Sequence, residues 1–290
     1  MDRRSGVCRR ARDSRSGWRG ARARPGRRRG ARVDLGIARA PNAKLAYVTP
    51  AHHAPLGVTL PADRRLALLD WAEAMRAWIV EDDYDSEFRY ESRPVAALAA
   101  LDRHGVVIHT GSFSKTMVPG LRLAYVVAPE ALVSRFVAAK SVLDRFTPPL
   151  LQEALAEFIH EGHFARHLRR MRELYAERRT ALLEAIADEL PAIEVVGAEA
   201  GIDVVARLPP GVDDQAAALA LEKAGLDAMP LSDNAIRPLA RGGLILGFAG
   251  FTPAKLRTAV SAMKRALAPL LPPVRRPRRA GSMATRHRAT

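Results

Sequence analysis

The chain has 290 residues, of which 48% are apolar, and a formal net charge of +15. It is long enough for one large domain or two modest ones, and apolar enough to bury a core, which excludes a globally disordered protein. The sequence offers no membrane-helix-length apolar stretch and no apolar signal segment in residues 1–30, and its single Cys8 excludes a disulfide framework, so we expect a cytoplasmic protein with no membrane partner.

The positive charge is concentrated at the two ends of the chain. Residues 1–30 hold twelve Arg against two Asp, and residues 271–290 hold six Arg and no acid, which leaves about −1 between them. We predict disordered basic tails over 1–34 and 270–290, which would bind nucleic acid only weakly, through phosphates. The Arg-, Gly- and Ser-rich start also fits a misassigned first codon.

Between the tails, strand and helix patterns first alternate. Apolar runs predict strands at 45–48, 77–80, 106–109 and 123–127. Helical spacing predicts a helix over 61–76 and a helical turn near 95–101. The alternation indicates an α/β fold with a mostly parallel sheet and covered faces, which we place in a partial large domain over 35–160.

The later part of the chain has a different texture. We predict helices at 130–143, 148–160, 164–188, 214–224 and 253–267. We predict strands at 193–196, 202–208 and 244–248. These elements indicate a smaller α+β domain over 161–269, joined to the first by the long helix.

Residues with useful chemistry follow the predicted strands, where ligands bind in open parallel sheets. Lys115 follows a strand between apolar neighbours such as Phe113, and apolar surroundings would lower its pKa and make it a nucleophile toward carbonyls. Arg122, Ser112 and Ser114 are candidate phosphate ligands. Taken singly, a lysine after a strand is more typical of a solvated loop.

An acidic string, Glu81-Asp82-Asp83-Tyr84-Asp85, follows the preceding strand. A carboxylate such as Asp82 can pair with a protonated pyridine nitrogen, and the Tyr84 hydroxyl can donate to a phenolate oxygen. An isolated acidic string is more often a helix cap or a solvated surface. Together with an aldehyde-reactive lysine and an anion site, it meets the requirements of pyridoxal 5'-phosphate.

The motif Ser112-Phe113-Ser114-Lys115 followed by Pro119-Gly120-Leu121-Arg122 resembles the cofactor-lysine motif of fold-type I (class I/II) aminotransferases. Tyr47-Val48-Thr49-Pro50 and the string from Glu81 to Tyr90 are most similar to the C-terminal aminotransferase-like domain of MocR-type regulators. That group belongs to the GntR superfamily and carries a winged-helix DNA-binding domain ahead of this one. The resemblance covers about residues 35–268.

The resemblance implies a role for each candidate residue. Lys115 would form an aldimine with pyridoxal phosphate, Asp82 would hold the pyridine nitrogen and Tyr84 would contact the phenolic oxygen. The phosphate would be bound by Ser112, Ser114 and Arg122. His52 or His53 lies in a loop that supplies another ring contact in the family, although a role in loop packing fits equally well.

Two departures from the family pattern bear on activity. Residues 1–34 contain no winged helix, and the first half of the large domain, with its glycine-containing phosphate loop, is not found, so we expect an N-terminally truncated domain with exposed sheet edges. Gly250 stands where the pattern places a carboxylate-binding Arg. The chemistry of Arg–carboxylate pairing makes this loss costly for amino-acid recognition.

Four functions therefore stay open. The chain is either a pyridoxal-phosphate-binding domain related to MocR-type transcription regulators, with the cofactor or an amino compound as effector, or a working transaminase. It is otherwise a nucleic-acid binder acting through its tails, or an inactive fragment. The resemblance implies a homodimer, and no ligand spacing around His52 and His53 indicates a metal.

Overall fold

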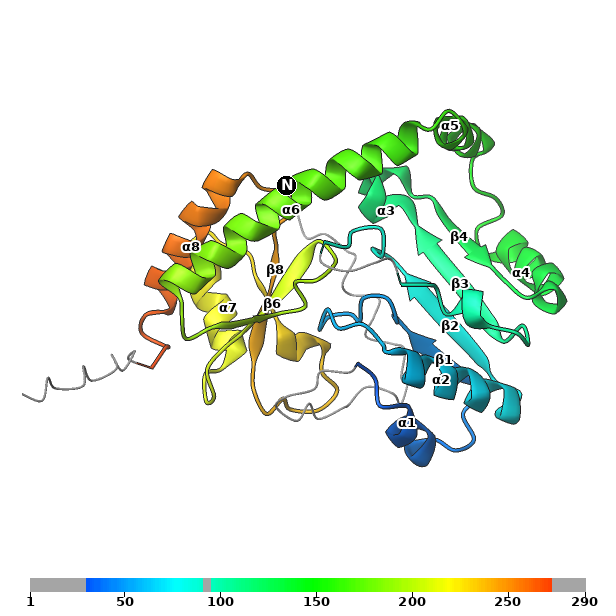
Figure 1. Ribbon diagram of the computed structural model, residues 1–290, viewed down its shortest axis with the longest axis horizontal. Helices are drawn as coiled ribbons and strands as arrows, with labels where there is room; N and C mark the ends of the chain where they lie inside the picture. The colour runs from blue at the N-terminus through cyan, green and yellow to red at the C-terminus, as the bar shows by residue number, and fades with distance from the viewer. Residues whose placement is uncertain (1–29, 91–94, 273–290) are drawn as a thin grey trace, which may run out of the picture.

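The computed structural model describes residues 30–90 and 95–272, which form two units, each built on a four-stranded sheet (Figure 1). The strands of the first sheet, in spatial order, are β1 (Leu45–Val48), β2 (Trp78–Asp83), β3 (Val107–Ser112) and β4 (Ala124–Val127). The first three strands are parallel, and β4 is antiparallel to β3. The α/β fold and the mostly parallel sheet predicted from the sequence are confirmed.

One face of this sheet is covered by two helices, α1 (Val33–Arg39) and α2 (Ala62–Met75). Leu68 and Ala72 of α2 pack against Ile79 of β2, and all three side chains are fully buried. Helix α1 was not predicted. The predicted disordered tail over 1–34 is wrong for its last residues, because Arg64 donates to the Gly30 and Ala31 carbonyls and Val33 opens α1 and is buried in this core. The rest of that predicted tail, and residues 273–290 of the other, lie outside the described residues.

The second unit is α+β, as predicted. Its strands, in spatial order, are β5 (Glu194–Val196), β6 (Asp203–Arg207), β8 (Gly243–Gly247) and β7 (Met229–Pro230), all antiparallel. Helices α6 (His163–Glu189), α7 (Asp214–Lys223) and α8 (Pro253–Leu267) gather on one side of this sheet (Figure 1). Strand β7 was missed because two residues, one of them Pro, are too short for a periodic pattern.

Helix α6 links the two units. Its Phe164 ring lies 5.8 Å from Phe113 in the short helix α3 (Phe113–Thr116), and His167 Nε2 lies 2.9 Å from the Thr116 carbonyl oxygen. Its later turns pack on α8 in the core of the second unit. Within residues 30–90 and 95–272, no helix combines the length and apolarity needed to cross a membrane.

Helix α4 (Glu130–Leu143) follows β4 in the chain, and α5 (Pro149–His160) packs against α6 (Figure 1). Every residue of β4 is exposed, and α4 buries none of its residues. The exposed apolar side chains of this surface include Val126, Val127 and Val137. Strand β4, which is last in the order of the first sheet, thus leaves an apolar surface uncovered within the described residues.

The two units meet along a close seam between the chain around residue 57, the chain at 88–90 and the segment 197–201. Gly201 N–H donates to the Phe88 carbonyl at 2.8 Å, and the Tyr90 hydroxyl donates to the Gly201 carbonyl at 2.7 Å. At Gly57, an added Cβ would lie 2.8 Å from the carbonyl oxygen of Gly197. The seam therefore requires glycine where the two backbones touch.

We predict that Gly57→Ala destabilises the protein more than Gly211→Ala does. Both glycines have positive φ, +68° and +84°, so both substitutions strain the backbone, but only the Gly57 Cβ meets another chain segment. The extra clash should cost about 1–3 kcal/mol in the free energy of unfolding. Urea unfolding of the two variants measures the difference, and equal losses would show that the seam is not tightly packed.

Candidate functional site

The parallel register of the first sheet brings its strand ends to one edge. Val48 pairs with Glu81, and Asp82 pairs with Thr110. The predicted strand at 77–80 is three residues too short at its end, because Glu81, Asp82 and Asp83 continue the β2 ladder against β3. The acidic string thus begins inside the strand, and its side chains alternate between the two faces of the sheet.

Asp82 lies on the face opposite α2. Its carboxylate accepts hydrogen bonds from the Tyr47 hydroxyl of β1 and, at 3.5 Å, from the Thr110 hydroxyl of β3. Sequence reasoning did not assign Tyr47 or Thr110 to the site. The strand alternation could have identified them, since both positions share the Asp82 face in a parallel register.

Glu81 lies on the other face and has a structural role. It is buried, and its two oxygens accept hydrogen bonds from the backbone N–H groups of Leu98 and Ala99 and contact His109 Nδ1 at 3.0 Å. Burial would raise the pKa of Glu81, but these hydrogen bonds lower it overall. Glu81 therefore fixes the start of the short helix Ala99–Leu101 and takes no part in the exposed edge.

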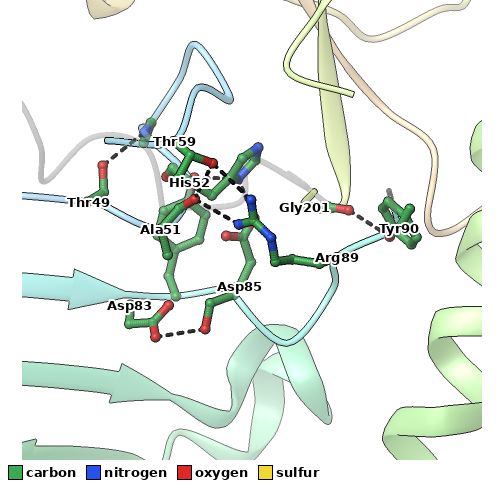
Figure 2. A network of polar contacts seen from close by, with 12 residues as sticks. Thr49, Ala51, His52, Thr59, Asp83, Asp85, Arg89, Tyr90 and Gly201 are labelled. Carbon is green, nitrogen blue, oxygen red and sulfur yellow. Dashed lines mark hydrogen bonds and ion pairs between the residues drawn. The ribbon is translucent and has the colours of Figure 1, made fainter. Parts of the chain in front are cut away.

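A buried pair, His52 and Asp85, lies just beyond these strand ends (Figure 2). His52 Nδ1 is 2.8 Å from Asp85 Oδ2, and the two side chains are only 2% and 1% exposed. Burial alone would lower the pKa of His52, but Asp85, with a further contribution from Asp203, raises it overall. His52 Nε2 has no hydrogen-bond partner among the described residues.

Tyr84 is held by the same loop. Its hydroxyl donates to the His52 carbonyl at 3.1 Å and lies 3.2 Å from His52 Nδ1. Burial and the charges of Asp85 and Asp203 raise the pKa of Tyr84 far above its usual value, so that the phenol stays protonated and can act as a donor. Of the two adjacent histidines, His52 is therefore the one that contacts Tyr84. Burial lowers the pKa of His53, which favours its neutral form.

Arg89 supports the loop that carries His52. Its guanidinium donates to the Ala51 carbonyl at 3.1 Å and to the Thr59 hydroxyl at 2.9 Å, as Figure 2 shows. The loop is thereby tied to the chain that follows β2. Sequence reasoning quoted Arg89 only as part of a motif, because nothing in the spacing connects it to residues about thirty positions earlier.

Lys115 lies on α3, directly after β3. The helix is capped by Ser112, whose hydroxyl oxygen accepts a hydrogen bond from Ser114 N–H at 3.2 Å. The predicted apolar surroundings of Lys115 are not found: its side chain is exposed, and Phe113 packs instead against Tyr125 and Phe164.

Arg122 follows the short helix Pro119–Leu121 and has the left-handed backbone conformation, with φ of 53°. This conformation is uncommon for a residue with a side chain and is typical of turns with a special constraint. The strand pairing of Ser112 with Ala124 brings the Arg122 backbone close to Ser112. Both residues, with Ser114, therefore cluster near the end of β3.

Polar and charged residues beyond the carboxyl ends of parallel strands define a ligand site of an open-sheet α/β protein. A family profile described as "Aminotransferase class I and II" matches residues 36–263. The chain belongs to the aminotransferase class I and II family and is related to MocR-type regulators.

Two curated relatives and one solved structure illustrate this relationship. The probable rhizopine catabolism regulatory protein MocR of Rhizobium meliloti is 40% identical over 230 residues, which are 78% of this chain and 46% of the relative. The uncharacterized HTH-type transcriptional regulator YhdI of Bacillus subtilis (strain 168) is 35% identical over 231 residues, 79% of this chain and 49% of the relative.

The solved structure is LysN, an alpha-aminoadipate aminotransferase from Thermus thermophilus, complexed with N-(5'-phosphopyridoxyl)-L-leucine. It is 28% identical, with a TM-score of 0.77 over 85% of this chain and 64% of that one. The chain spans about half the length of the curated relatives it matches.

The residues at the strand ends fit pyridoxal phosphate by the chemistry of their donors and acceptors. Asp82 offers a carboxylate to a protonated ring nitrogen, and Tyr84 stays a phenol that can donate to a ring oxygen. Ser112 uses its oxygen to accept from Ser114, which leaves its hydroxyl proton free to donate to an anion. Arg122, whose backbone lies close to Ser112, offers a guanidinium that suits the same anion.

We predict that Asp85→Asn lowers the free energy of unfolding, and that the loss is largest at low pH. Because the pKa of His52 is raised, its charged form contributes stability that is fully present below its ordinary pKa of about 6.5 and is lost as the pH rises through the raised value. The substitution would remove the paired charge and cost about 3 kcal/mol near pH 6, with a smaller loss near pH 9.

Urea unfolding at several pH values checks this expectation. Glu73→Gln is the matched control, because Glu73 pairs with His104 on the surface and both side chains are about half exposed. A loss in Asp85→Asn that does not change with pH would contradict the assignment of a charged His52.

Proposed function

We propose that this chain is a pyridoxal-phosphate-binding domain in which the cofactor, or an amino compound bound to it, is the effector of a MocR-type regulator. The observation that carries the proposal is that Asp82, Tyr84, Ser112 and Lys115 all lie at, or just after, the carboxyl ends of the neighbouring parallel strands β2 and β3. Membership of the aminotransferase family supports the same cofactor. The regulatory role is supported by relatives named as regulators.

Each residue would make one contact with the cofactor. Lys115 would supply the amine that attaches to it, and the exposed position of Lys115 leaves that amine accessible. Asp82 would keep the ring nitrogen protonated, and the Tyr84 hydroxyl would turn its single proton from the His52 carbonyl to the ring oxygen. Ser112, Ser114 and Arg122 would bind the phosphate. When bound, the cofactor supplies an aldehyde that captures amines and a ring that withdraws electrons.

His52 would hold Tyr84 in position and would not itself contact the cofactor. Its carbonyl holds the Tyr84 hydroxyl at 3.1 Å, and its ring is fixed by Asp85. In this arrangement His52 positions the phenol, which fits the loop-packing role that the sequence left open better than a direct contact with the cofactor ring.

A working transaminase is the second candidate. It is favoured by the likeness to LysN, an aminotransferase crystallised with a phosphopyridoxyl adduct. The same Lys115 and Asp82 would serve both functions, so only turnover separates them. Formation of a keto acid from several amino donors would favour the enzyme, and binding without turnover would favour the effector domain.

We predict that the purified protein mixed with pyridoxal phosphate gains a visible absorbance band that depends on Lys115. Borohydride reduction should then attach the cofactor's mass to the peptide that contains Lys115. Lys115→Ala should abolish the band and the mass increase, whereas Lys140→Ala, on the surface of α4, should leave both intact. A band of equal strength in Lys115→Ala would overturn the proposed attachment. No band in any variant would favour the inactive fragment.

We further propose that the chain forms a homodimer through the exposed surface of β4 and α4. Val127 and Val137 are 58% and 63% exposed, and exposed apolar patches of this kind mark association sites. Val137→Glu should shift the sedimentation coefficient from dimer to monomer. Leu219→Glu, at a similarly exposed site on α7, should not. A monomeric native protein, or equal behaviour of both variants, would contradict this surface.

A further inference from the structure

The sheet of the second unit turns one face toward the candidate site. On the opposite face, Val204, Leu244 and Leu246 belong to the core under the helices. The alternate residues Val205 and Ile245 form a smaller cluster that Leu56, on the loop after His52, packs against. The face that carries Val205 and Ile245 therefore looks toward the first unit.

Asp203 lies at the end of this face that is nearest to the site. Two residues before it, an added Cβ on Gly201 would lie 2.7 Å from His52 Nδ1 and 2.8 Å from Asp85 Oδ2. The Asp203 carboxyl interacts electrostatically with His52, Asp85 and Lys115. Asp203 thus belongs to the surroundings of the proposed cofactor lysine, although it comes from the other unit.

Space is open beside Asp203. Its partner across the β6–β8 ladder is Gly247, which is exposed, and a Cβ added there would meet nothing within 4 Å. Directly opposite side chains in an antiparallel pair are about 5 Å apart, so a ligand group in this space would touch the Asp203 carboxylate.

The charged group on this part of the face is the Asp203 carboxylate. Val205 and Ile245 are apolar, and Arg207 lies at the far end of β6, opposite Glu194. Burial and Asp85 raise the pKa of Asp203, while His52 and Lys115 oppose this rise. A cation placed against Asp203 would therefore be favoured, and a ligand carboxylate would be repelled.

We propose that Asp203 determines the ligand class of the site, selecting amino compounds that carry a second positively charged nitrogen. This inference rests on the proposed function. The ligand's first amine would replace the Lys115 amine at the cofactor's aldehyde carbon, so that one carbon–nitrogen linkage forms while another breaks, and no oxidant is consumed. Its second, protonated nitrogen would pair with the Asp203 carboxylate across the seam.

The test compares three amines with chains of equal length. 1,5-Diaminopentane ends in a cation, pentylamine in a methyl group and 5-aminopentanoate in an anion. Each is titrated into the full chain loaded with pyridoxal phosphate, and binding is followed by the change in absorbance and by calorimetry. We expect the diamine to bind about tenfold or more tightly than pentylamine, and 5-aminopentanoate to bind most weakly.

Asp203→Asn keeps the shape of the side chain and removes its charge, so it should abolish the preference for the diamine while the absorbance of the bound cofactor stays. Glu199→Gln removes an exposed charge from the same segment and should keep the preference. Melting temperatures of the variants report whether each is folded.

The outcomes separate the two proposals. A cofactor band with equal affinity for the three amines in the native protein would overturn the role of Asp203 and leave the proposed function standing. Loss of the preference in Asp203→Asn alone would support the role. Absence of the cofactor band in the native protein would overturn the proposed function, and this inference with it.

Discussion

The parallel ladder of β1, β2 and β3 is the constraint on which the candidate site depends. Parallel strands direct all their carboxyl ends to the same edge, and the register sets Asp82 beside Thr110 and close to Tyr47. The ladder exists because the residues on its inner face, such as Ile79, are buried against α2. Burial on one face thus places polar groups on the other, and a slip of one residue would exchange the positions of Glu81 and Asp82.

Much of the architecture could be predicted, because periodicity is a local property. The strand Leu45–Val48 and the helix near 61–76 follow from apolar spacing alone, and the end of β2 was misplaced because charged residues continue its ladder. Partners distant in sequence could not be predicted. Nothing in the sequence near His52 shows that its partner is Asp85. The prediction of apolar surroundings for Lys115 was wrong because Phe113 packs on the rings of Tyr125 and Phe164.

Glycine residues allow the second unit to lie close to the candidate site of the first. The backbones at Gly57 and Gly197 approach so closely that neither has room for a side chain, and Gly201 does the same beside His52 and Asp85. These contacts join residues more than a hundred positions apart, which is why sequence reasoning, limited to local pattern, found the smaller domain but not its contribution to the site. The two sheets keep separate cores, and the seam brings polar residues of both units into one region.

The charges of this region are divided between the units, and the division has a chemical consequence. Lys115 and Arg122, both from the first unit, suit an anionic cofactor, whereas the second unit offers the carboxylate of Asp203. The buried His52 pairs with Asp85 and compensates the charge of that carboxylate. A ligand that spans the seam would meet a cofactor on one side and an acid on the other. Binding such a ligand would reinforce the contact between the units, which is the property an effector domain needs if ligand binding is to change its shape or rigidity.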